Sequence, residues 1–276
     1  FIYGLYGVLD DEGKFRPGVC WDHPFPQNED QYYAYIQRFF RRVKQLAPDI
    51  RIMAHLGKGK ANITLDLSGP ALHQRFHRQG TGEAPLKENL AAAMLLFAAW
   101  PREAAAGGGL FDPLCGSATL PIEAALIAGD VAPGLLRAES GGAGSRSRSG
   151  GSAPAFGFLR WRGHDARVWS ALLAEARERR DAGLARLAVA RPGPAIHGSD
   201  HDPRAVRLAR DCARRAGLRD LVAFEQAELA TVVPSAGRGL LVANAPYGER
   251  LDATEAEAVY RQLGERLRAA FSDWAA

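Results

Sequence analysis

Long hydrophobic runs and paired cysteines are both missing from this 276-residue sequence. No apolar run approaches the roughly 18–20 residues that a transmembrane helix needs, and the opening FIYGLYGVLDDEG lacks the basic region of a signal peptide. The three cysteines form no Cys-x-x-Cys pair, which argues against a disulfide framework and against a structural zinc site. We therefore expect a cytoplasmic protein with reduced thiols. The cysteines are Cys20, Cys115 and Cys212.

A strong excess of charge of one sign is also missing. The formal net charge is +4, a mild basic bias that is compatible with a polyanionic partner without requiring one. At 47% hydrophobic and 24% charged residues, the chain has the composition of a globular protein with a sizeable core.

The first hundred residues predict a small α+β arrangement. Apolar residues recur at helical spacing over 29–46, with a basic opposite side that is either a solvated face or a phosphate-contacting one. Two alternating runs, 50–56 and 62–68, are joined by GKGK and predict a β-hairpin. The Ala- and Leu-rich stretch 82–100 predicts a largely buried helix. The basic residues of the first helix are Arg38, Arg41, Arg42 and Lys44.

From about residue 105 the pattern alternates between strands and helices, which indicates a parallel sheet in an α/β domain. One interruption, the Gly/Ser-rich stretch 137–155, cannot bury a core and predicts a disordered surface loop. Strands are expected near 109–112, 195–199, 221–226 and 239–243. Helices are expected near 119–128, 165–189, 203–216 and 255–272.

Acidic residues follow the first three of these strands. Asp112 ends the first strand and precedes a tight turn at Gly116, which is also compatible with an ordinary strand-to-helix turn. Asp200 ends the second strand, where a carboxylate can accept hydrogen bonds from both ribose hydroxyls of a nucleoside. Glu228 follows the third strand and can accept from an adenine amine. Because ligands bind at the carboxyl ends of parallel strands, the three acids together predict an adenosine-containing cofactor.

Two other features near Asp200 have simpler readings. Asp202 and Pro203 fit the N-cap and first position of the next helix. The alternative, a metal cluster that includes His197 and His201, lacks a third ligand at a recognised spacing, and we expect no metal.

The fourth strand ends in NAPYGER, with Asn244 at its carboxyl tip. The Asn244 side-chain oxygen and a backbone carbonyl of the turn can accept both hydrogens of a planar amine and orient its lone pair. Pro246 stiffens the turn, and Tyr247 offers a flat ring on which an unstacked base can lie. The turn therefore predicts a site that orients a planar amine towards an electrophile.

Five segments in order resemble the THUMP-domain class I RNA guanine-N2 methyltransferases, with the likeness running from about residue 48 to about 267. The segments are IRIMAHLGKGKANITLDLSGPALHQRF with GEAPLKENLAAAML, DPLCGSATLPIEAALIA, FGFLRWRGHD, GSDHDPRAVRLARDCARRAG and NAPYGERL. The resemblance implies a Rossmann-like sheet that binds S-adenosylmethionine, preceded by a partial THUMP-like RNA-binding module. It implies domains at 1–80 and 105–276 with a linker helix at 81–104.

The same resemblance assigns the site residues and the substrate. Donor binding falls to Asp112, Cys115, Gly116, Ser117, Asp200, Glu228 and Asn244, and catalysis to Asn244, Ala245, Pro246 and Tyr247. The implied acceptor is a guanine N2 in RNA, with ribosomal RNA preferred over transfer RNA.

The sequence departs from the family at three places. Ala118 and Ala245 replace the family's usual glycine and proline, and further strands are expected after the fourth helix, so a C-terminal truncation or a missing partner segment is implied. Two alternatives therefore stay open: an RNA-binding protein with impaired catalysis, and a methyltransferase acting on tRNA guanine or on another planar amine.

Overall fold

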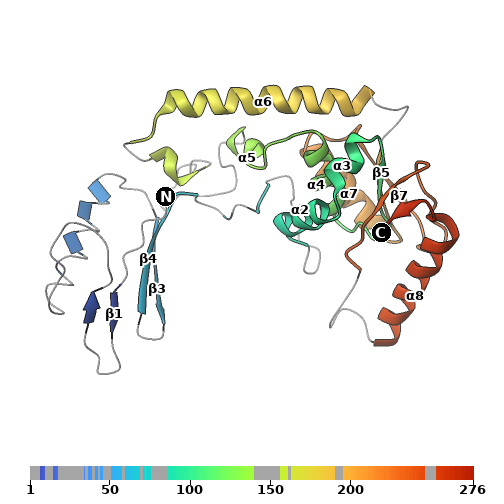
Figure 1. Cartoon of the computed structure of the whole chain (residues 1–276), viewed down its shortest axis with the longest axis horizontal. Coiled ribbons are helices and arrows are strands. Elements are labelled where there is room, and N and C mark those ends of the chain that lie inside the picture. The colour runs from blue at the N-terminus through green and yellow to red at the C-terminus, as the bar shows by residue number, and fades with distance from the viewer. Residues whose placement is uncertain are drawn as a thin grey trace. The chain divides into compact units, whose positions relative to one another are not determined.

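The structure is a computed structural model that divides the chain into two compact units. One unit comprises residues 1–71 and 140–168, and the other comprises residues 72–139 and 169–276 (Figure 1). These limits differ from the predicted domains, because the expected linker 81–104 falls within the second unit. The described residues are 7–9, 15–17, 34, 37–38, 41–42, 44–45, 51–57, 60–68, 71, 73–75, 86–139, 156–160, 163–189, 195–245 and 253–276.

The first unit contains an antiparallel sheet with strand order β2-β1-β4-β3. Its centre is the predicted hairpin, in which Arg51 pairs with Asp66 and Gly57 pairs with Lys60 at the turn. The other two strands were not predicted, because three-residue strands leave almost no periodic signal. The bounds are β1 (Gly7–Leu9), β2 (Phe15–Pro17), β3 (Arg51–Gly57) and β4 (Lys60–Asp66).

A short 3-10 helix, Gly157–Arg160, packs against the end of β4. The Phe158 N–H donates to the Leu67 carbonyl at 2.8 Å, and a Cβ on Gly157 would lie 2.6 Å from the Asp66 carbonyl oxygen. The predicted helix over 29–46 is described only in part, and its described basic residues are helical and exposed. Those residues are Arg38, Arg41, Arg42 and Lys44.

The second unit is built on a five-stranded parallel sheet with order β7-β6-β5-β8-β9. The four predicted strands are confirmed, and the sheet gains a fifth, because the two-residue β9 pairs with β8 beyond the last helix. Two residues are too few for a periodic signal in the sequence. The bounds are β5 (Gly109–Asp112), β6 (Ile196–Asp200), β7 (Val222–Gln226), β8 (Gly239–Leu241) and β9 (Trp274–Ala275).

Helices cover both faces of this sheet, so each central strand is buried on two sides. On β5, Leu110 joins the core beneath α2, α4 and α7, whereas Phe111 joins the core beneath α8. On β8, Leu240 and Leu241 divide in the same way. The helices are α2 (Glu88–Phe97), α3 (Trp100–Ala105), α4 (Thr119–Ala128), α5 (Leu135–Glu139), α6 (Ala166–Val189), α7 (Pro203–Arg215) and α8 (Ala253–Ala270).

The predicted helix 82–100 is broken near its end. Helix α2 stops at Phe97, and α3 restarts at Trp100 after Ala99 adopts a left-handed φ of 56°. Pro101 explains the break, because proline has no N–H to continue a helix but fits the first turn of a new one. Both helices pack into the core on α4, since Leu95 and Trp100 are buried and the Trp100 indole donates to the Ala124 carbonyl.

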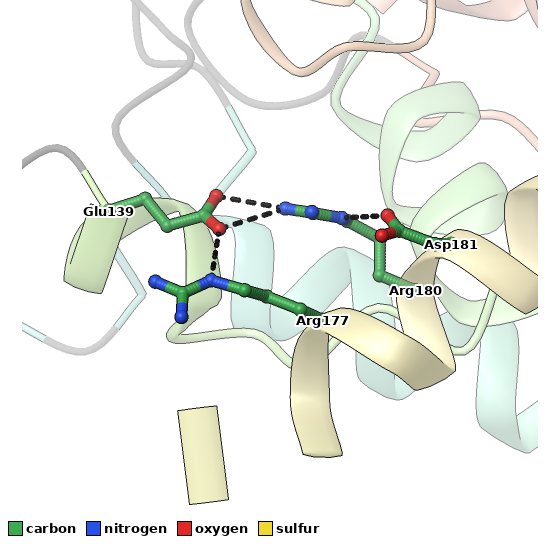
Figure 2. A network of polar contacts seen from close by, with 4 residues as sticks. All are labelled: Glu139, Arg177, Arg180 and Asp181. Carbon is green, nitrogen blue, oxygen red and sulfur yellow. Dashed lines mark hydrogen bonds and ion pairs between the residues drawn. The ribbon is translucent and has the colours of Figure 1, made fainter. Parts of the chain in front are cut away.

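The predicted disordered loop 137–155 begins too early. Residues 137–139 complete α5, and Arg137 is buried with 2% of its surface exposed. Glu139, at the end of α5, accepts hydrogen bonds from Arg177 and Arg180 of α6 at 2.9–3.0 Å (Figure 2). This ion-pair cluster ties α5 to α6. The rest of the predicted loop, 140–155, lies outside the described residues.

Candidate active site

The order in which successive strands are added to the sheet reverses between β5 and β8, and the candidate site lies at this point. The chain proceeds from β5 to β6 and β7 on one side, then crosses to β8 and β9 on the other. Crossovers on opposite faces leave a crevice beyond the carboxyl ends of the two central strands, where open α/β sheets bind ligands. Asp112 and Asp200 end their strands here, whereas Glu228 and Asn244 lie just beyond the ends of β7 and β8.

The loop after β5 is fastened to the neighbouring strand by backbone hydrogen bonds. The Cys115 N–H donates to the Ser199 carbonyl at 2.9 Å, and the Gly116 N–H donates to Asp200 Oδ2 at 3.0 Å. Gly116 has a φ of 51°, which favours glycine, and no atom of the described residues lies within 4 Å of a Cβ built there. The loop therefore has a fixed shape, and no described residue fills the space beside Gly116 at the amino end of α4.

Ala118 occupies another left-handed position, with a φ of 65°, directly before α4. Its side chain is fully buried, and its N–H donates to the Cys115 carbonyl at 2.7 Å. A left-handed alanine costs roughly 1–2 kcal/mol relative to the right-handed conformation, which explains why glycine suits this position. The chain folds through the same turn despite the extra methyl group.

Asp200 joins three segments of the site. Its Oδ2 accepts from the Gly116 N–H, its Oδ1 accepts from the Asp202 N–H at 3.0 Å, and its carbonyl accepts from the Ala227 N–H. The side chain is 14% exposed and lies 3.4 Å from the His201 ring nitrogen Nδ1. Each carboxylate oxygen has a second lone pair, so the residue can still accept two hydroxyl hydrogens. Because it can accept hydrogen bonds from two hydroxyl groups, Asp200 fits the ribose of a nucleoside cofactor.

Asp112 lies deeper than Asp200, with 2% of its surface exposed. Burial raises the pKa of its carboxyl from 3.8 to about 7. The Leu114 N–H donates to Oδ1 at 3.1 Å and lowers this pKa, whereas the charge of Asp200 raises it further. Burial and the two neighbouring carboxylates also raise the pKa of the Cys115 thiol well above its ordinary value. The thiol therefore stays protonated and does not serve as a nucleophile.

The remaining predicted residues occupy the same edge or fall outside the described chain. Glu228 is exposed, and its carbonyl accepts from the Thr231 N–H and hydroxyl. Ser117, Asn244 and Ala245 are half-buried, whereas Pro246 and Tyr247 lie outside the described residues.

The segment after β8 is held beside β5. The Val242 N–H donates to the Phe111 carbonyl at 3.0 Å, so the chain runs alongside the end of β5 as it approaches Asn244. This contact brings the catalytic turn predicted from the sequence to the strand that carries Asp112.

Two expectations about the Asp200 region can be examined directly. Asp202 caps α7, since its Oδ1 accepts from the Arg204 N–H at 2.8 Å and Pro203 is the first helical residue, which confirms the capping prediction. The His197 ring stacks on Phe111, with ring centroids 6.5 Å apart. Among the described residues, no group of three or more His, Cys, Asp and Glu side chains could hold a metal ion.

No helix among the residues that the structure describes is long and apolar enough to span a bilayer.

The sequence did not reveal a buried ion pair behind the site. Arg75 donates to Glu123 of α4 at 3.0 and 3.3 Å, and the two side chains are 10% and 4% exposed. Burial raises the pKa of Glu123, Arg75 counteracts this effect, and Glu88 reinforces it. Nothing in the sequence links two residues 48 positions apart. The hydrogen bonds made by the Ser199 carbonyl and the Gly116 N–H were not predicted either, because every residue carries the same backbone groups and the sequence does not mark which of them pair.

Known proteins match the chain in both sequence and structure. The sequence profile described as "RMKL-like, methyltransferase domain" matches residues 75–276. A relative from Methylococcus capsulatus is 51% identical over 228 residues, covering 82% of this chain and 28% of the relative. Another, from Aeromonas salmonicida, is 46% identical over 264 residues, covering 87% and 33%. Both are named Ribosomal RNA large subunit methyltransferase K/L, and the chain spans about a third of their length.

Two crystal structures have the same fold over most of the chain. That of SMU.472, complexed with SAH, is 31% identical with a TM-score of 0.66, and the match covers 88% of this chain and 58% of that one. A "predicted N6-adenine-specific DNA methylase" from Listeria monocytogenes is 30% identical with a TM-score of 0.65, covering 89% and 58%.

Proposed function

Because the chain belongs to the family of RMKL-like methyltransferase domains, we propose that it methylates a guanine N2 amine in RNA, with S-adenosylmethionine as donor. Ribosomal RNA is the preferred substrate, since relatives that are 46–51% identical are named for ribosomal RNA methylation. Such a substrate places the activity in the cytoplasm. Residues 1–80 serve in this proposal as a partial THUMP-like RNA-binding module.

One observation carries the proposal: Asp112, Asp200 and the Asn244 turn share one edge of the sheet at its topological switch point. The loop between Asp112 and α4 leaves open space above Gly116, where a ligand can approach the backbone closely. Asp200 has acceptor capacity left for two hydroxyl groups. These features fit an adenosine-containing donor.

Each residue has a separate task in this proposal. Asp200 fixes the ribose, the Gly116 turn and the amino end of α4 accommodate the polar end of the donor, and Glu228 accepts from the adenine amine. S-adenosylmethionine supplies an electrophilic methyl group. The Asn244 side-chain oxygen and the Ala245 carbonyl accept the hydrogens of the target amine, which directs its lone pair along the line of transfer. As the N–C bond forms, the methyl–sulfur bond of the donor would break and leave a neutral thioether. The methylated amine would then lose its proton to water, so no strong base is needed.

A second candidate acceptor is the N6 amine of adenine. It is favoured by the name of the Listeria monocytogenes structure, and the Asn-x-Pro-Tyr turn suits any planar exocyclic amine. The K/L names of the curated relatives favour RNA over DNA. Mass spectrometry of nucleosides from methylated RNA distinguishes N2-methylguanosine from N6-methyladenosine.

Donor binding is tested by titrating the 276-residue chain with S-adenosylmethionine in a calorimeter. Asp200→Ala should abolish detectable binding, because it removes the ribose acceptor and the anchor for Gly116. Asp220→Ala, the same change at an exposed position after α7, serves as the matched control. Equal affinities for the wild type and Asp200→Ala would refute the assignment of this pocket.

Methyl transfer is tested with labelled donor and bulk ribosomal RNA. Asn244→Ala should lower turnover by about 10²–10³, the usual loss when one transition-state contact is removed, and should leave donor affinity nearly unchanged. Donor binding by the wild type without any labelling of RNA would instead favour an RNA-binding protein with impaired catalysis. Normal turnover by Asn244→Ala would exclude the catalytic role of that residue.

A further inference from the structure

Helix α7 carries an unusual concentration of arginine on its outward face. Between Pro203 and Leu218 there are five arginines and one acidic residue, Asp211, and no lysine. Four of the arginines are exposed and the fifth is half-buried, while the opposite side of the helix packs into the core through Val206, Ala209 and Cys212. The arginines are Arg204, Arg207, Arg210, Arg214 and Arg215.

These residues share one face because they are spaced three, three, four and one apart along a helix of 3.6 residues per turn. At 100° per residue they fall within an arc of about 140°. We call this arc, together with Arg219 in the following turn, the basic track. Asp211 lies within the arc, and Asp202 and Asp220 lie at its two ends, so three acidic side chains face six guanidinium groups and the net charge of the track is positive. Arg215 contributes least at the surface, because its Nη1 is buried.

A hollow of about 500 Å³ lies at the far end of the basic track. Arg210, Arg214 and Arg219 line it, together with small apolar side chains and the first residues of β7. None of the described residues that line the hollow is acidic. Its volume is within the usual range of ligand sites, and its cationic groups suit an anion.

Two of these guanidinium groups are already held in place. Arg210 donates from Nη2 to the Phe224 carbonyl at 2.6 Å, and Arg214 donates from Nη1 to Asp211 Oδ1 at 2.7 Å. Guanidinium has five N–H donors, so each retains several for another acceptor. A planar donor group fixed in this way binds phosphate oxygens with little loss of side-chain entropy.

The hollow is separate from the candidate active site. It contacts Val222, Ala223 and Phe224 at the start of β7, whereas the active site lies beyond the carboxyl ends of the strands. The 13 residues of α7 span about 20 Å from one end to the other, and β7 lies three strands, about 15 Å, from β8. A nucleic acid strand whose base enters the site at Asn244 can reach the basic track, because single-stranded sites commonly cover about 4–16 nucleotides.

We propose that the basic track binds backbone phosphates of the RNA substrate, away from the base that is methylated. The ligand is a polyanion bound through its phosphates, so the contact is independent of base identity. This inference rests on the proposed function for its choice of RNA. The methyl-transfer pocket is not involved, and changes in the track should affect substrate binding without affecting donor binding.

The test is the double variant R214Q/R219Q, which removes two exposed guanidinium groups of the track. The control is R261Q/R268Q on α8, which loses the same charge at two exposed positions. Binding to a fluorescein-labelled single-stranded RNA of about 20 nucleotides is followed by anisotropy between about 50 and 200 mM salt. Donor affinity and methyl transfer are measured on the same preparations.

Loss of two phosphate contacts lowers the slope of log K against log salt by about 1.4, at roughly 0.7 per contact on a single strand. Across that fourfold salt range, the wild type and control should lose about sevenfold more affinity than R214Q/R219Q. Donor affinity should be equal in all three proteins. This pattern supports the proposal.

Three other results would contradict the proposal. If the wild type methylates RNA and R214Q/R219Q has the same RNA affinity and salt slope, the basic track is refuted while the proposed function stands. If the wild type binds the donor but neither binds nor methylates RNA, the proposed function fails, and the track fails with it. A shift shared equally by R214Q/R219Q and R261Q/R268Q reports net charge alone and also refutes the track.

Discussion

Replacing Asp112 with asparagine should stabilise the ligand-free protein, and should do so increasingly as the pH rises. Asp112 is 2% exposed, and burial raises the pKa of its carboxyl from 3.8 to about 7. The folded state therefore holds this proton between pH 4 and pH 7, where the unfolded state has released it. Stability must fall as the pH rises through this window, and the loss is complete above pH 7.

The size of this effect follows from the difference between the two pKa values. A difference of about three pH units at about 1.36 kcal/mol each gives roughly 4 kcal/mol of lost stability above pH 7. At pH 5 roughly 1–2 kcal/mol has already been lost, since the unfolded carboxyl is mostly ionised there. Asparagine has nearly the same shape and no charge, so the advantage of Asp112→Asn should grow by roughly 2–3 kcal/mol between pH 5 and pH 8.

Urea denaturation at several pH values measures this advantage directly. In thermal melts, each kcal/mol corresponds to about 2–4 °C for a domain of this size. Asp220→Asn provides the matched control, because the same chemical change at an exposed position should give no pH-dependent gain. The measurements are made without donor, because a bound ligand stabilises the folded state by mass action.

A constant difference between Asp112→Asn and the wild type from pH 5 to pH 8 would refute the reasoning. It would mean that Asp112 is ionised in the folded protein throughout this range, and that the substitution acts only through packing or the hydrogen bond from Leu114. The predicted stabilisation would identify Asp112 as a group that costs stability in the service of a ligand.

Two further substitutions test the packing around the site by urea denaturation. Arg75→Ala should lower the free energy of unfolding by about 3–5 kcal/mol, because it leaves the buried Glu123 carboxylate unpaired. The exposed Arg179→Ala should cost far less, because solvent screens its ion pair with Asp130, and equal losses would contradict the burial argument. Gly183→Ala should cost about 1–3 kcal/mol or displace α6, since a Cβ there would lie 1.9 Å from the Gly129 carbonyl oxygen. A Gly183→Ala protein as stable as the wild type would show that α6 does not approach Gly129 so closely.

The local features of the candidate site could be predicted because their signals are short-range. Buried parallel strands appear as apolar runs, and each of the first two ends in an acid, Asp112 or Asp200. Asp202 and Pro203 together marked the start of α7, because capping depends only on neighbouring residues. The hairpin around Gly57 was equally visible, since its register depends on a short turn and two alternating strands.

Other features escaped prediction because their cause lies far away in the sequence. Arg137 was assigned to a polar loop on composition, yet it is buried in α5 beside a helix formed some thirty residues later. The break before Trp100 had a visible signal in Pro101 that the apolar pattern of the stretch concealed. β9 becomes a strand only because β8 offers it an unpaired edge.

The sequence by itself determined the strand-and-helix order, the acids at the strand ends and the asparagine turn, because each depends on residues within a few positions of one another. Only the tertiary structure decided that these residues share one edge of a sheet. It also decided that Asp112 is buried, which raises the pKa of its carboxyl to near neutral pH. The order β7-β6-β5-β8-β9 depends on which strands pair, and the pairs that β5 makes with β6 and β8 join residues more than 80 positions apart. Burial and the pKa of Asp112 follow from that pairing, because both depend on every atom that surrounds the carboxyl group.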